Sequence, residues 1–146
     1  MDIINTFSRE RLLKLRGRLE DLNVDGFIVP HSDEYQNEFL PSRSERLAWL
    51  TSFDGSAGLA VITADKAAIF VDGRYTLQAK LEVDEALYET SPIANISTEK
   101  WLIDELPHGS RFGYDPHLHN RAQAERLRKA CESAGSILVP VRTNPL

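Results

Sequence analysis

The spacing of hydrophobic residues predicts a helix near the N-terminus. Four leucines recur at three- and four-residue steps along residues 8–22, namely Leu12, Leu15, Leu19 and Leu22. Such spacing places them on one apolar stripe, with charged residues on the other faces. Asn23 is typical of a helix end, and the short apolar run 27–29, closed by Pro30, predicts a buried strand.

Further short apolar runs predict more strands. The runs 59–63 and 67–71 are separated by only three residues, 64–66, a spacing that favours an antiparallel β-hairpin. Three more strands are expected over 87–90, 111–114 and 137–139. We expect the first of these three to lie at an edge of the sheet.

Capping signals place additional helices between these strands. Ser42 with Glu45, and Asn120 with Gln123, have the spacing of capping boxes. Gly135 lies where a left-handed residue ends a helix. The predicted helices cover 42–50, 75–82, 98–106 (capped by Ser97 or Thr98) and 120–134.

This alternation of helices and strands, together with one hairpin, predicts an α/β fold. We expect three layers, α/β/α, around a mixed, mostly parallel sheet of about six strands. The length of 146 residues suits one domain, residues 1–146. Since 143–146 do not resemble a finished terminus, we expect a domain excised from a longer protein.

Composition narrows the possible functions. Seventeen Lys+Arg against 22 Asp+Glu give a net charge of −5, which argues against nucleic-acid binding, and 42% hydrophobic residues argue against disorder. No signal peptide or membrane-spanning run is visible. The lone Cys131 cannot form an internal disulfide. We expect a soluble, cytoplasmic protein without a membrane partner.

Two candidate sites are weak on residue type alone. Asp115, His117 and His119 offer metal-ligating groups, but alternate loop residues need not converge, and solvent-facing histidines are the simpler interpretation. The segment 55–58, Gly-Ser-Ala-Gly, lacks the lysine and the following helix of a phosphate loop. Ser56 also lacks the spacing of a nucleophile elbow.

A third candidate follows the strand 67–71. Arg74 leaves its end after Asp72 and Gly73 and carries a planar charged group that suits a carboxylate or carbonyl. By residue type alone, internal pairing with Asp72 or Asp54 is the favoured interpretation.

Three ordered blocks change this balance. They are 29–41 (VPHSDEYQNEFLP), 52–58 (SFDGSAG) and 71–75 (VDGRY). Together they resemble the N-terminal domain of aminopeptidase P (Xaa-Pro aminopeptidase), the creatinase/prolidase N-terminal type. The resemblance extends through 113–116 and 138–140.

The resemblance implies a metallopeptidase that removes the N-terminal residue of a peptide whose second residue is proline. Its chemistry would lie in a separate C-terminal domain holding two divalent cations, manganese being the usual choice. This chain would have no catalytic residue and no metal site, and would shape the substrate cleft beside its own catalytic domain. The resemblance further implies a homodimer of the full-length protein.

The same resemblance implies substrate contacts by Arg74, Tyr35 and Asp72. Arg74 matches the family's substrate-contacting arginine. Tyr35 replaces a histidine common before Gln36, and its hydroxyl retains hydrogen-bonding capacity. Two alternatives stay open: a catalytically inactive binding or regulatory relative, and the N-terminal domain of a prolidase or creatinase.

Overall fold

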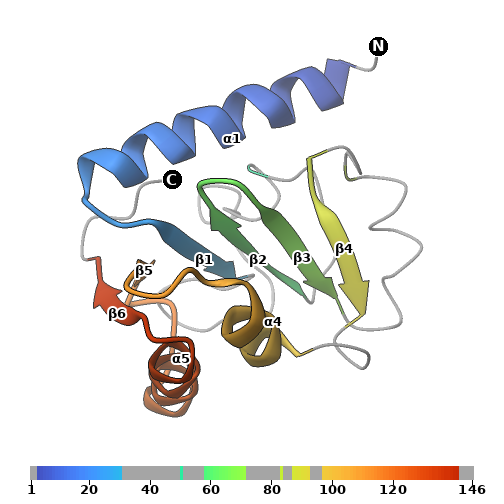
Figure 1. Ribbon diagram of the computed structural model, residues 1–146. Helices are drawn as coiled ribbons and strands as arrows, with labels where there is room; N and C mark the ends of the chain where they lie inside the picture. The colour runs from blue at the N-terminus through green and yellow to red at the C-terminus, as the bar shows by residue number, and fades with distance from the viewer. Residues whose placement is uncertain are drawn as a thin grey trace.

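A six-stranded mixed sheet forms the centre of the chain (Figure 1). The structure is a computed structural model that describes residues 3–30, 50, 58–71, 83, 87–92 and 97–141. The strands are β1 (Gly26–Pro30), β2 (Gly58–Thr63), β3 (Ala67–Val71), β4 (Glu89–Pro92), β5 (Arg111–Tyr114) and β6 (Ile137–Pro140). Their spatial order is β4-β3-β2-β1-β5-β6, so β4 lies at an edge, as predicted.

Strand directions follow from the lengths of the connections. The three-residue turn 64–66 forces β2 and β3 to be antiparallel, which confirms the predicted hairpin. β1 is antiparallel to β2, whereas the pairs β1–β5, β3–β4 and β5–β6 are parallel. Three of the five pairings are therefore parallel, and the predicted mixed, mostly parallel sheet is confirmed.

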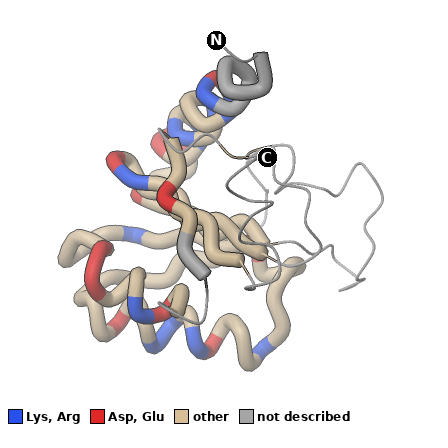
Figure 2. Tube along the Cα trace, turned by 90° about the vertical axis from the view of Figure 1, so that its right-hand side faces the viewer, with Lys and Arg blue, Asp and Glu red and all other residues tan. Residues whose placement is uncertain are grey.

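Helices cover both faces of this sheet. α1 (Ile3–Asp21) crosses one face, while α4 (Thr98–Glu105) and α5 (Arg121–Ser133) pack on the other (Figure 1). Figure 2 shows from the side that charged residues concentrate on the helices and turns rather than on the strands. The predicted α/β/α layering is therefore confirmed for the described residues.

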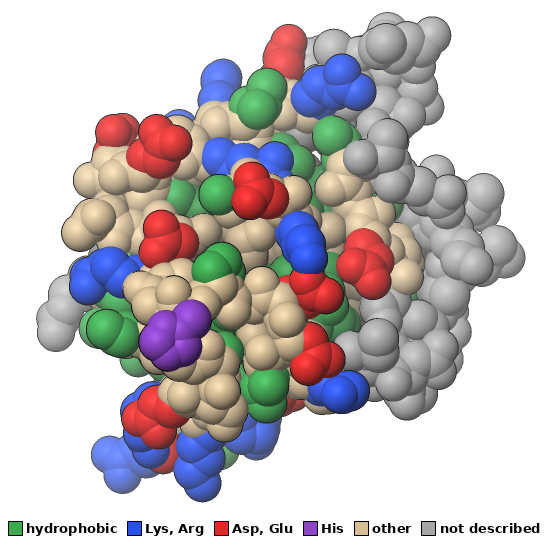
Figure 3. All heavy atoms as spheres, viewed as in Figure 1, with side chains coloured by type: hydrophobic (Ala, Val, Ile, Leu, Met, Phe, Trp, Pro, Cys, Tyr) green, Lys and Arg blue, Asp and Glu red, His purple; other side chains and the backbone are tan. Residues whose placement is uncertain are grey.

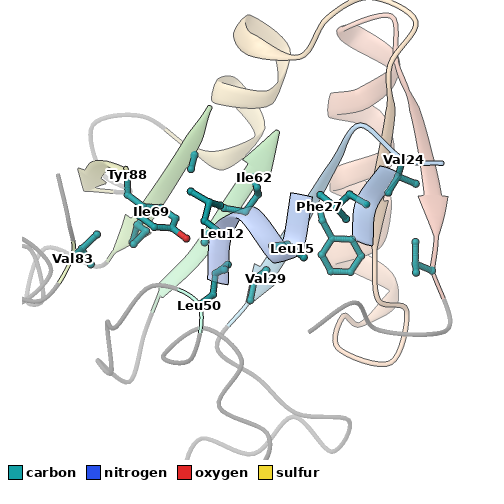
Figure 4. Close-up of a cluster of buried hydrophobic side chains, with 14 of the residues drawn as sticks. Leu12, Leu15, Val24, Phe27, Val29, Leu50, Ile62, Ile69, Val83 and Tyr88 are labelled. Atoms are coloured by element: carbon teal, nitrogen blue, oxygen red, sulfur yellow. The ribbon is translucent and has the colours of Figure 1, made fainter. Parts of the chain in front are cut away.

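The sheet separates two hydrophobic cores because successive strand residues face opposite sides. Phe27 and Val29 pack with Leu12 and Leu15 of α1, as Figure 4 shows. Leu19 belongs to the same cluster, whereas Ile28 faces α4 and α5. On that second face the Phe70 and Trp101 rings meet edge to face, with their centroids 6.1 Å apart. Both cores are needed, since a sheet of this composition exposes an apolar surface on each side.

The end of α1 corrects one part of the sequence prediction. Leu22 was expected on the buried stripe, yet it lies past the helix end and is 37% exposed. Asn23 adopts a left-handed conformation with φ 58°, so the chain turns and Val24 becomes buried instead. The Val24 N–H donates to the Leu19 carbonyl at 3.0 Å. This hydrogen bond, to a carbonyl five residues earlier, is typical of the Schellman motif at a helix C-terminus. The helix also begins at Ile3, five residues before the predicted start.

The two helices on the other face follow their capping signals closely. Ser97, rather than Thr98, is the N-cap of α4, and its hydroxyl accepts from the Lys100 N–H. Asn120 and Gln123 form the predicted reciprocal capping box of α5. Gly135 has φ 76°, which is the predicted left-handed end. The helices predicted over 42–50 and 75–82 lie outside the described residues, except for the helical, fully buried Leu50.

Candidate functional site

The three motif blocks adjoin one end of three neighbouring strands. Pro30, which ends β1, pairs with Leu59, and Gly58, which begins β2, pairs with Val71 at the end of β3. Adjacent strands lie about 4.8 Å apart, so the three chain positions fall within about 10 Å of one another. The sheet therefore brings together the points at which 31–41, 52–57 and 72–75 leave or enter it.

Arg74, Asp72 and Tyr35 themselves lie outside the described residues. The described residue that is nearest to Arg74 in the sequence is Val71, which is fully buried in the core beneath α1. β3 lies between β2 and β4, so Val71, the residue that precedes Asp72 in the sequence, is paired on both sides. The roles of these three side chains in binding a substrate remain sequence-based predictions.

A fourth segment reaches the same end of the sheet. β5 is parallel to β1, with Phe27 opposite Gly113, so the turn after Tyr114 lies on the Pro30 side. The Asp115 side chain is buried at the start of this turn. Its Oδ1 accepts from the His117 N–H at 2.8 Å and lies 3.1 Å from Nδ1 of the same residue. Asp115 therefore shapes the turn and orients the exposed His117 ring.

His119 was expected to face solvent, and the structure contradicts this expectation. Its ring packs edge to face on Tyr114, with centroids 5.9 Å apart, and its Nε2 is buried without a hydrogen-bond partner among the residues that the structure describes. Burial lowers the pKa of His119 to about 4, and the neighbouring Asp115 opposes that shift. The apolar Leu118 between the two histidines was the available signal, since its burial draws this turn inward.

This arrangement does not provide a metal centre. Within the described ranges, no three His, Cys, Asp or Glu side chains gather where they could hold an ion. Asp115 pairs with His117, while the His119 ring packs against Tyr114. The metal interpretation of these three residues is therefore not supported.

Among the described helices none is both long and apolar enough to cross a bilayer.

A cavity of about 310 Å³ lies at the opposite end of the sheet. It adjoins Asp25, which precedes β1, and Thr63, which ends β2. Asp25 Oδ2 accepts from the Arg111 N–H at 2.7 Å, so this carboxylate is hydrogen-bonded to the first backbone amide of β5, beside the start of β1. This cavity lies at the end of the sheet opposite Pro30, Gly58 and Val71, and we assign the candidate site to the end that these three residues share.

Comparisons with known proteins agree with this architecture. The sequence profile of the creatinase/prolidase N-terminal domain matches residues 11–143. Xaa-Pro aminopeptidase 2 from Homo sapiens is 35% identical over 133 residues, which are 91% of this chain and 20% of that protein. A probable Xaa-Pro aminopeptidase P from Penicillium rubens is 36% identical over 137 residues, 92% of this chain and 22% of that protein.

Solved structures give the same result. The X-prolyl aminopeptidase of Caenorhabditis elegans, described as a cytosolic enzyme with a di-nuclear active site, superposes with a TM-score of 0.87 at 28% identity. The match covers 94% of this chain and 24% of that one. The N-terminal domain of a putative metallopeptidase from Corynebacterium diphtheriae shares the fold, with a TM-score of 0.69 at 23% identity over 93% and 96% of the two chains. This chain spans about a fifth of the length of its curated relatives.

Proposed function

Since this chain belongs to the creatinase/prolidase N-terminal domain family, we propose that it is the non-catalytic N-terminal domain of a metal-dependent Xaa-Pro aminopeptidase. The single observation behind this proposal is that Pro30, Gly58 and Val71, the described residues at the edges of the three motif blocks, meet at one end of strands β1, β2 and β3. The full-length enzyme would remove the N-terminal residue that precedes proline. Residues 1–146 would form one wall of its substrate cleft.

The names of the relatives favour an aminopeptidase over the alternatives. Relatives from three mammals, each called Xaa-Pro aminopeptidase 2, are 33–35% identical over more than nine-tenths of this chain. The Xaa-Pro dipeptidase of Bacillus anthracis shares the fold at 19% identity, so the prolidase alternative has weaker support. A cytosolic location and a di-nuclear metal centre, manganese being our choice of ion, are properties we extend from the C. elegans enzyme.

The chemistry would divide between two domains of one polypeptide. Metal ions held by the C-terminal domain would activate a water molecule. This chain would position the peptide, because the X–Pro amide has no N–H and must be recognised through its carbonyls and shape. Arg74 would donate to a peptide carbonyl or carboxylate, while Tyr35 and Asp72 would complete the polar wall. We further propose that the full-length protein is a homodimer.

The first experiment separates the domain from the enzyme. The full-length protein and residues 1–146 are each assayed on a short Xaa-Pro peptide with Mn²⁺. Cleavage is expected from the full-length protein alone. Cleavage by residues 1–146 would contradict the non-catalytic assignment, whereas an inactive full-length protein would favour the regulatory alternative.

The second experiment tests Arg74. Arg74→Ala in the full-length protein should lower kcat/KM about 10- to 150-fold, since a charge-assisted contact contributes about 1.5–3 kcal/mol. Arg18→Ala is the matched control. Arg18 lies in the last turn of α1, which leads into the start of β1, at the end of that strand away from Pro30. An unchanged kcat/KM in a folded Arg74→Ala protein would remove Arg74 from the substrate site.

A further inference from the structure

The turn that follows β5 is anchored by three of its side chains. The Asp115 side chain is only 4% exposed and accepts from the His117 N–H, Leu118 is buried, and the His119 ring packs on Tyr114. His117 projects from this anchored turn, with 59% of its side chain exposed. The turn therefore presents an imidazole from a fixed base.

The Asp115 carboxylate also determines which ring nitrogen of His117 is available. Nδ1 lies 3.1 Å from Asp115 Oδ1, and an ionised carboxylate can only accept, so Nδ1 of the neutral ring donates this hydrogen bond. Nε2 is then an acceptor, because a neutral imidazole carries a single N–H. A ligand of this nitrogen must therefore bring a hydrogen-bond donor.

The turn lies beside the strand ends that carry the candidate site. β5 ends at Tyr114, opposite Ile28, so the chain that follows continues toward the level of Pro30. From β3 through β2 and β1 to β5 there are three strand spacings, about 14 Å, which is the length of about four extended residues. A peptide that lies across these strand ends from the β3 side therefore reaches His117 after about four residues.

We propose that His117 Nε2 accepts a hydrogen bond from a main-chain N–H of the substrate peptide, downstream of its proline. This inference rests on the proposed function and adds a second contact to the one assigned to Arg74. The X–Pro amide has no N–H, so the donor belongs to the third residue of the peptide or a later one. Because the reach is about four residues, a peptide of five residues fills this distal subsite, whereas a tripeptide stops short of it.

The contact should favour long peptides without selecting their sequence. Recognition by Nε2 needs only a main-chain N–H, so it is independent of the side chains of the peptide. Figure 3 shows acidic and basic side chains interspersed on the viewed face, a pattern that favours neither an anionic nor a cationic peptide. The expected effect is therefore that of one neutral hydrogen bond.

Steady-state kinetics of the full-length protein on Ala-Pro-Ala and on Ala-Pro-Ala-Ala-Ala test the subsite. His117→Ala should lower kcat/KM about 2- to 12-fold on the longer peptide and leave it unchanged on the tripeptide. The turn should be retained, because the main-chain N–H at position 117 still donates to Asp115. His108→Ala is the matched control, since His108 is also exposed but lies beside the cavity at the opposite end of the sheet.

N-methylated peptides identify the donor. The longer peptide is methylated in turn on the main-chain nitrogen of its third, fourth and fifth residues. At one of these positions, methylation should lower kcat/KM more in the natural protein than in His117→Ala, because the variant has no acceptor left to lose. This comparison separates a hydrogen bond to the peptide from a purely structural role of His117.

Equal losses on the two peptides in His117→Ala, or no loss on the longer one, would overturn the inference. Methylation effects that are the same in both proteins at all three positions would do so as well. In these cases, cleavage of both peptides by the natural protein leaves the proposed function in place. A natural full-length protein that cleaves neither peptide would instead refute the proposed function, and this contact with it.

Discussion

Gly135 and the ring of His108 pack so closely that a Cβ atom on Gly135 would lie 2.2 Å from Cδ2 of His108. Gly135 also has φ 76° at the end of α5, where a side chain is strained. Gly135→Ala should therefore lower the free energy of unfolding by more than the about 1–2 kcal/mol that a left-handed backbone alone costs. Urea denaturation with linear extrapolation measures this loss.

A second glycine separates the two causes. Gly109 has φ 81°, but a Cβ atom there would meet nothing within 4 Å. Gly109→Ala should therefore show only the cost of the backbone conformation and be the milder of the two substitutions. If both variants lose the same stability, then the contact between Gly135 and His108 contributes nothing.

The capping box of α5 should be measurable by a graded pair of substitutions. Asn120 Oδ1 accepts from the Gln123 N–H at 2.8 Å, and Gln123 Oε1 accepts from the Asn120 N–H at 2.9 Å. Asn120→Ala should cost about 1 kcal/mol of unfolding free energy, whereas Asn120→Asp keeps an acceptor and should cost much less. Thermal denaturation of both variants tests the cap, and equal losses would show that the side-chain acceptor is unimportant.

His119 should make the domain less stable in mild acid. Burial lowers the pKa of His119 to about 4 in the folded chain, against 6.5 for a solvated histidine. Between pH 4 and pH 6.5 the unfolded chain binds more protons at His119 than the folded chain does. His119 therefore causes no loss of stability above about pH 6.5, and the free energy of unfolding falls as the pH drops toward 4. The loss should reach about 2–3 kcal/mol.

The control for this effect retains the ring. His119→Phe can keep the edge-to-face contact with Tyr114 but cannot be protonated. Urea denaturation at pH 7 and pH 4.5 should show a smaller acid-induced loss of stability in His119→Phe than in the natural chain. Equal losses in the two proteins would assign the acid sensitivity to other groups.

The thiol of Cys131 should be inert in the folded chain. Cys131 is completely buried on α5, and burial raises its pKa to about 11. At pH 8 a thiol reagent such as dithionitrobenzoate should react only after unfolding, since the thiolate is the reactive form. One thiol should then titrate in guanidinium chloride. Rapid labelling of the native chain would contradict this environment.

Local sequence patterns predicted the elements of the fold well, because each depends on neighbouring residues. The Asn120–Gln123 box and the turn 64–66 act over three or four positions, and both appear as predicted. The end of α1 was less predictable, since Leu22 continues the leucine spacing while Asn23 turns the chain away. The leucine spacing begins at Leu12, so it could not locate the start of the helix at Ile3.

Placement across the sheet was beyond local patterns. β1 lies between β2 and β5, and its pairing with β5 joins Gly26 to Phe112, which are far apart in the sequence. For the same reason His119 was expected to face solvent, because Tyr114, on which its ring packs, is in place only once β5 has been added to the sheet. The meeting of Pro30, Gly58 and Val71 at one end of the sheet likewise depends on strand order. The contacts of Arg74, Tyr35 and Asp72 rest on the family resemblance.

The barrier that the sheet places between Phe27 and Ile28 bears on how such a domain can diverge. Among the described residues, the buried side chains on the α1 side and those beneath α4 and α5 form two separate clusters, and the energetic effects of changes at well-separated positions generally add. A lineage can thus remodel one side through many conservative exchanges while the other side is inherited unchanged. Relatives that keep this architecture at low identity are what such independent drift would leave behind.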